Sequence, residues 1–174
     1  MPSHDDAAVP SADVPQAATK LGRIRATIEV LARGPSTGDD VATHAGMARR
    51  HAHYQLAAAR ALGWATREGA RRHAITREGR ALLDTTPGSA AERTRVVRAV
   101  RASPLVQALA RGLDPRSADL ELAIAERIER RTRPPLAPET ARERARTIAA
   151  WVRLAASPQE ALAFTRGVAA GDTT

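Results

Sequence analysis

Arginine side chains are the groups in this sequence best placed to do chemistry, and six of them form two clusters in the first half of the chain. The clusters are Arg49, Arg50 and Arg60 in segment 48–62, and Arg67, Arg71 and Arg72 in segment 67–72. A guanidinium can bind a phosphate or the edge of guanine through two parallel hydrogen bonds, which lysine cannot do. These residue types predict the binding of a polyanion rather than a bond-making reaction.

Segment 48–62 has the pattern of an amphipathic helix. On a wheel of about 100° per residue, Arg50, His53, Tyr54 and Ala57 share one side. The opposite side carries Ala48, Ala52, Gln55, Leu56, Ala59 and Leu62. A small residue at position 57 would let such a helix approach base edges closely. The alternative interpretation is an ordinary solvated helix face.

The other reactive side chains do not form the patterns of a catalytic or metal site. His51 and His53 are two residues apart and point in different directions on a helix, and His44 brings no Cys or carboxylate motif. Glu126 and Glu129 lie one turn apart among arginines, which favours charge pairing within a helix. We therefore expect no catalytic residue, no metal and no cofactor, and no enzymatic activity.

Composition supports a basic protein. The net charge is +8, although the first 18 residues hold Asp5, Asp6 and Asp13 and no Lys or Arg, so the rest of the chain is more basic still. A body of this charge attracts polyanions. Lys20 is the only lysine. The abundance of arginine and alanine also fits a GC-rich genome, which is an alternative explanation of the bias.

Several features bear on the expected location. The absence of Cys excludes disulfides and thiolate metal sites, and fits a reducing compartment. There is no apolar run of about 18 residues and no secretory signal at the start, so we expect no membrane span. These features predict a cytoplasmic, nucleoid-associated protein.

The order of elements around the arginines can be predicted from local patterns. We expect a disordered tail over 1–19, a helix over 21–32, a second helix capped by Ser36 or Thr37, and a turn at 45–47 before the basic helix. Residues 64–66 and 74–76 can pair as a hairpin around the arginine-rich turn. Thr76 can cap the helix that follows. The predicted domain spans 20–84.

The stretch "RALGWATREGARRHAITREGRALL" resembles the wing region of winged helix-turn-helix DNA-binding proteins, through Leu62-Gly63-Trp64 and through Thr76, Gly79 and Leu82. The resemblance covers residues 21–83. It extends to regulators and to the DNA-binding modules of restriction and phage-defence systems. It implies a basic helix in the DNA major groove and a wing on the DNA backbone.

The resemblance also implies roles for individual residues. Base contacts would fall to Arg50, His53 and Tyr54, flanked by Arg49 and Arg60, and backbone contacts to Arg67, Arg71 and Arg72. The basic helix is unusually rich in alanine and offers few groups that can read bases. We therefore expect the protein to grip DNA more firmly than it selects a sequence.

The second half of the chain has its own helical pattern. After a linker at 85–90 we expect a helical domain over 91–157, with helices at 91–102, 104–112, 117–132 and 138–156, and then a tail or short helix over 158–174. Aligning Arg49 with Arg142 also pairs three other identical residues and places Arg146 opposite His53. This alignment suggests a second helix-turn-helix that uses Arg142 and Arg146. The competing interpretation is a dimerisation or packing domain.

The sequence as a whole thus predicts a mainly α fold: an N-terminal winged helix-turn-helix with a small hairpin wing, followed by a helical C-terminal domain. The expected function is binding of double-stranded DNA, most simply as a transcriptional regulator, with a homodimer as one arrangement. The alternative is a docking module for a protein partner, for example in a multi-component defence system.

Overall fold

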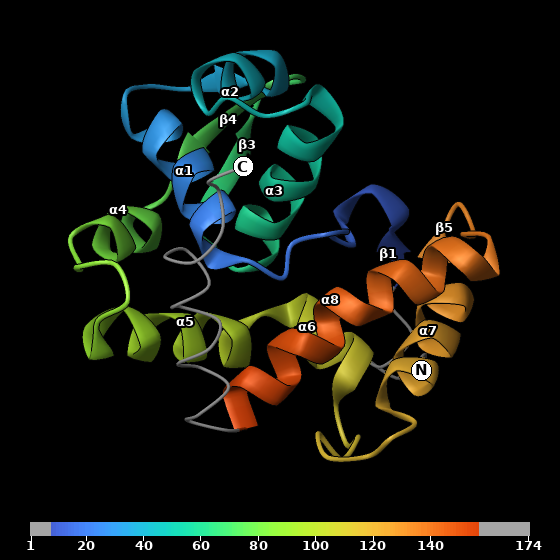
Figure 1. Ribbon diagram of the computed structural model, residues 1–174. Coiled ribbons are helices and arrows are strands. Elements are labelled where there is room, and N and C mark those ends of the chain that lie inside the picture. The colour runs from blue at the N-terminus through green and yellow to red at the C-terminus, as the bar shows by residue number, and fades with distance from the viewer. Residues whose placement is uncertain (1–7, 157–174) are drawn as a thin grey trace, which may run out of the picture.

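The protein is mainly helical, as predicted. The structure, a computed structural model, describes residues 8–156 (Figure 1). The N-terminal half (residues 20–84) contains α1 (Leu21–Ala32), β2 (Ser36–Thr37), α2 (Gly38–His44), α3 (Arg49–Ala61), β3 (Ala65–Glu68), β4 (Arg72–Ile75) and α4 (Arg77–Leu83). The helical half (residues 90–156) contains α5 (Ala90–Ala102), α6 (Pro104–Ala110), α7 (Leu120–Arg131), β5 (Thr132–Arg133) and α8 (Pro138–Ala156).

Side-chain caps set the starts of several helices. Thr37 accepts a hydrogen bond from the backbone N–H of Asp40, and the Asp40 carboxylate accepts one from Thr37 N at 2.8 Å. This reciprocal capping box lowers the pKa of Asp40. Thr76 caps α4 by accepting from the N–H of Gly79 at 3.0 Å. Both caps confirm the sequence prediction.

The hairpin is longer than predicted and belongs to a three-stranded sheet. Its strands are β3 and β4, in the order β2-β4-β3, and both neighbours of β4 run antiparallel to it. Arg67 and Arg72 therefore belong to strands, where a loop was expected. The reason is that the pairing of β3 with β4 continues to Glu68 opposite Arg72, which leaves only residues 69–71 for the turn. The strand β2 pairs with the other edge of β4, with Ser36 opposite His73.

The N-terminal half packs around large residues from several of its elements. Ile24 and Ile28 of α1, Leu56 of α3 and Trp64 beside the hairpin are each at most 2% exposed. Gly79 of α4 lies so close to this core that a Cβ atom there would stand 2.3 Å from the carbonyl oxygen of Trp64. The absence of a side chain at Gly79 thus lets α4 close against the start of the hairpin.

The helical half is built around α8. This helix contacts α5, α6 and α7, and it packs along most of the length of α7. Its buried residues include Ala141, Ala145, Ile148 and Leu154, together with Trp151, which is fully buried. On a helical wheel of 138–156 Trp151 falls at the edge of the apolar face, whereas the structure places it in the core.

The predicted disorder of residues 1–19 is wrong for the N-terminal segment (residues 8–19). This segment forms β1 (Val9–Pro10), which pairs in parallel with β5, and the 3₁₀ helix η2 (Ser11–Asp13). Val14 is 2% exposed and Ala18 is fully buried. The segment has too few apolar side chains to form a core of its own, but it packs against the surfaces of α3 and α8. Residues 1–7 and 158–174, predicted as tails, lie outside the described residues.

The two halves are joined through a buried ion pair as well as by the chain. Nη1 of Arg25 in α1 lies 2.6 Å from a carboxylate oxygen of Glu92 in α5. The same guanidinium donates to the carbonyl oxygens of Leu82, Leu83 and Thr85. Segment 85–90, expected to be a linker, is therefore anchored at its start against α1.

Candidate nucleic-acid interface

The first turns of α3 carry the predicted base-contacting residues, and they reach solvent. Arg49, Arg50 and His53 are exposed, and Tyr54 is half-buried. Arg49 forms an ion pair with Asp39 at 2.5 Å, whereas Arg50 has no partner among the described residues. Arg50 therefore presents an unneutralised guanidinium at the end of α3 that base-reading helices most often use.

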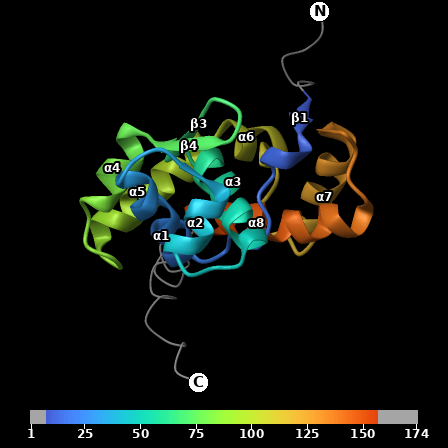
Figure 2. The ribbon, with the colours of Figure 1, turned by 90° about the horizontal axis from the view of Figure 1, so that it is seen from above.

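The outer face of α3 does not continue to its C-terminus, contrary to the prediction. Ala57 is only 6% exposed, and Arg60 forms an ion pair with Asp13 at 2.7 Å that leaves its side chain 16% exposed. Figure 2 shows the N-terminal segment running between α3 and α7. The contact of η2 with α3 argues against the predicted roles of Ala57 and Arg60 at a groove, and the DNA contact of Arg60 stays a prediction.

Two histidines lie where α3 meets the sheet. His53 stands over Gly38 so closely that a Cβ atom on that glycine would lie 2.7 Å from Cε1 of His53. His73 of β4 is 8% exposed, and its Nδ1 has no hydrogen-bond partner. Burial, reinforced by the nearby Arg60 and Arg67, lowers the pKa of His73 to about 4. His73 is therefore neutral near pH 7.

Two arginines of the hairpin have no partner among the described residues, and the third forms a hydrogen bond with the backbone. Arg67 and Arg71 are exposed and have no partner among the described residues. Arg72 donates to the carbonyl oxygen of Pro35 at 2.6 Å. Arg67 and Arg71 are thus available to an anionic ligand, whereas Arg72 also braces the hairpin against the β2 end of the sheet.

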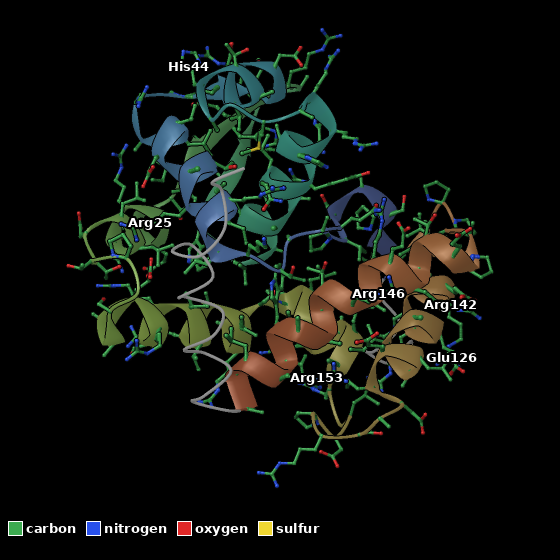
Figure 3. All side chains as sticks on the ribbon, in the orientation of Figure 1. Arg25, His44, Glu126, Arg142, Arg146 and Arg153 are labelled. Carbon is green, nitrogen blue, oxygen red and sulfur yellow. The ribbon has the colours of Figure 1, made fainter. Side chains whose placement is uncertain are left out.

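Arg142 and Arg146 are exposed on α8 (Figure 3). The N-terminal segment separates them from α3, since Arg144 of α8 donates to the carbonyl oxygens of Ser11 and Val14. Gln16 also donates to Glu143 at 2.5 Å. The central place of α8 in the core favours the packing-domain interpretation over a second recognition helix. The roles assigned to Arg142 and Arg146 stay predictions.

The N-terminal segment belongs to this surface, although no local sequence pattern predicts it. The one sequence feature that points to a contact with a basic surface is Asp13, the last acidic residue of a stretch with no Lys or Arg. Its significance depends on Arg60, which is 47 residues away in the chain. The Arg25–Glu92 pair is unpredictable for the same reason, because nothing local distinguishes Arg25 from the other arginines.

Within residues 8–156, no cluster of three or more His, Cys, Asp or Glu side chains is placed to hold a metal ion. None of the helices there is both long and apolar enough to cross a membrane. Comparisons of the chain with protein-family models, curated proteins and solved structures found no match.

Proposed function

We propose that the protein binds double-stranded DNA through the N-terminal turns of α3 and the β3–β4 hairpin, as a winged helix-turn-helix. One observation carries the proposal: Arg50, Arg67 and Arg71 are exposed and unpaired on a helix and a hairpin that pack against each other. The order of α1, α2, α3, hairpin and α4 supports it. So does the positive net charge of +8.

In this proposal the first turns of α3 enter the major groove. Arg50 binds the O6 and N7 atoms of a guanine, and His53 and Tyr54 contact the neighbouring bases or phosphates. Arg49 adds a phosphate contact when it exchanges Asp39 for DNA. Arg67 and Arg71 lie on the adjacent backbone, with a smaller share for Arg72 because it already binds Pro35. Arg60 stays with Asp13.

The biological role that fits this interface best is transcriptional regulation. A single reading element with one unpaired base-reading arginine gives modest selectivity. A homodimer that places two copies of α3 in successive major grooves would supply the rest. The exposed stripe of α8, which includes Arg142 and Arg146, is available for added DNA contacts or for the second subunit.

Fluorescence anisotropy with labelled duplexes of random sequence at physiological salt tests the proposal. We expect binding by the full chain, and loss of most of that binding in the triple variant Arg50→Ala/Arg67→Ala/Arg71→Ala. Arg116→Ala is the control, because Arg116 is exposed in the loop between α6 and α7, away from the proposed interface. Unchanged affinity in the triple variant would overturn the proposal. Absence of binding to any duplex would favour the docking-module alternative.

A further inference from the structure

A cavity of about 270 Å³ lies where the two halves of the protein meet. One wall is the end of α3 with the start of the hairpin, including Leu62 and Trp64. The other wall is α5 with the start of α6, including Ala99 and Ala102. Arg95 and Arg98 of α5 also line it, together with Glu78 of α4.

The two α5 arginines give the cavity an unsatisfied positive charge. Arg95 and Arg98 are three residues apart and therefore neighbours on one face of the helix. Neither forms a hydrogen bond or ion pair with another described residue. The third arginine in the lining, Arg60, is already neutralised by Asp13. Glu78 lies near Arg77, with 3.4 Å between their charged atoms.

The remainder of the lining is apolar. Ala61, Ala99, Ala102 and Pro104 are at least partly exposed and offer carbon surface to the cavity, whereas Leu62 and Trp64 line it but are only 4% and 2% exposed. Inorganic anions gain little from such walls. A ligand with a small hydrocarbon body and one anionic end satisfies both the walls and the arginines.

We propose that this cavity binds a small amphipathic monocarboxylate, with its carboxylate held by Arg95 and Arg98 and its apolar body against Ala99, Ala102 and Pro104. The volume suits one ring with a short carboxylate-bearing arm, since it is slightly below the range of about 300–1,000 Å³ typical of drug-sized ligands. The single charge is favoured because Glu78 repels a second negative group.

The location gives this ligand a function that rests on the proposed DNA binding. The cavity wall includes the last residues of α3 and the junction to β3, so a bound ligand would hold α3 and the hairpin in a fixed position against α5. DNA affinity would change if the bound and empty cavities favour different positions of the hairpin. The ligand would then be an effector of DNA binding.

Ligand binding is tested without DNA, by isothermal titration calorimetry and thermal unfolding of the full chain. The probes are benzoate and phenylacetate, with benzamide as the uncharged analogue of benzoate and inorganic phosphate as the anion without an apolar body. We expect at least one carboxylate to bind and to raise Tm, and both control compounds to bind at least tenfold more weakly. Equal binding of phosphate, or no binding of either carboxylate, would overturn the proposal.

Two variants locate the site. Arg95→Gln/Arg98→Gln removes the charge, and Ala99→Leu fills the cavity while leaving both arginines in place. Each should reduce carboxylate affinity at least tenfold, whereas Arg116→Gln should not. Carboxylate binding that survives in both folded variants would contradict the proposed site.

DNA binding is measured separately, so that the two proposals can fail independently. Carboxylate binding that follows the expected pattern in a protein that binds no DNA would retain the ligand site and remove the proposed function. If the Arg95→Gln/Arg98→Gln variant loses DNA affinity and no carboxylate binds, these arginines contact DNA phosphates and the ligand site is refuted.

Discussion

Arg50 and Arg71 are the single residues on which the proposed DNA interface depends most. Substituting each by alanine should change DNA binding in a different way. Arg50→Ala removes a base contact, so we expect a loss of roughly 1–3 kcal/mol on preferred sites and a flatter sequence preference. Arg71→Ala removes a phosphate contact and should weaken binding to all duplexes alike. Selection of bound DNA from a random pool by each variant distinguishes the two. An unchanged base preference in Arg50→Ala would contradict the assignment of this residue.

His73 should make the stability of the protein depend on pH. Its folded pKa is about 4 against an ordinary value of 6.5, so the unfolded chain binds a proton that the folded chain does not. Its stabilising contribution is complete above pH 6.5 and is lost as the pH falls towards 4. The loss amounts to about 3 kcal/mol when calculated from the shift.

Urea unfolding at pH 7 and pH 4.5 measures this effect. His73→Gln should show a smaller loss of stability between the two pH values than the natural sequence. His51→Gln, which changes a half-buried histidine of α3, should keep the full loss. An identical pH dependence in the His73→Gln protein would show that another group is responsible.

Among the elements, α1, α4 and α5 are held together by Arg25 and Glu92. The Arg25 side chain is 11% exposed and that of Glu92 is 2% exposed. Arg25→Met leaves a buried carboxylate without its cation, so we expect a loss of about 3–5 kcal/mol in the free energy of unfolding. Glu29→Gln changes the more exposed partner of Arg25 and should cost less than about 1 kcal/mol.

A double-mutant cycle makes this prediction specific to the ion pair. Arg25→Met/Glu92→Leu removes both charges and should be less destabilised than the sum of the two single variants. Strictly additive losses, measured by urea unfolding, would show that the two residues contribute through packing alone.

The N-terminal segment sets how much of α3 can contact DNA. Asp13→Asn removes the anion paired with Arg60, so we expect a modest rise in DNA affinity, less than tenfold, at low salt. The partly exposed pair contributes little to folding, and the variant should lose less than about 1 kcal/mol of stability. Asp119→Asn removes the same charge from the start of α7 and serves as the control. An equal rise in both variants would indicate a general effect of net charge.

For the whole molecule, the net charge of +8 predicts DNA binding that weakens steeply with salt. Each phosphate contacted contributes about −0.9 to the slope of log affinity against log salt concentration. We expect Arg67→Ala and Arg71→Ala each to reduce the magnitude of this slope by about 1, and Arg116→Ala to leave it unchanged. Anisotropy titrations over a series of salt concentrations supply the slopes, and equal slopes in all variants would contradict wing contacts with phosphate.

Local features of the chain could be predicted because they depend on neighbours a few residues apart. The periodicity of Leu21, Ile24 and Ile28 predicted α1, and the hydroxyls of Thr37 and Thr76 were recognised as caps of α2 and α4. The ends of the strands depend on partners that are distant in the chain. The strands extend to Glu68 and Arg72 because these residues pair across the hairpin, and β2, separated from β4 by two helices and β3, pairs with the other edge of β4.

Contacts between distant segments were decided only by the tertiary structure. Trp151 is buried in contact with the N-terminal segment, where its Nε1 donates to the carbonyl oxygen of Ala18. Ala57 is buried because η2 packs against α3. Both contacts involve the N-terminal segment, a polar, proline-containing stretch that is held by backbone hydrogen bonds and by packing against α3 and α8. Local patterning could specify the arginines of α3 and the hairpin, because helix and strand periods are short-range properties. Which of these arginines stays free depends on partners brought together by folding.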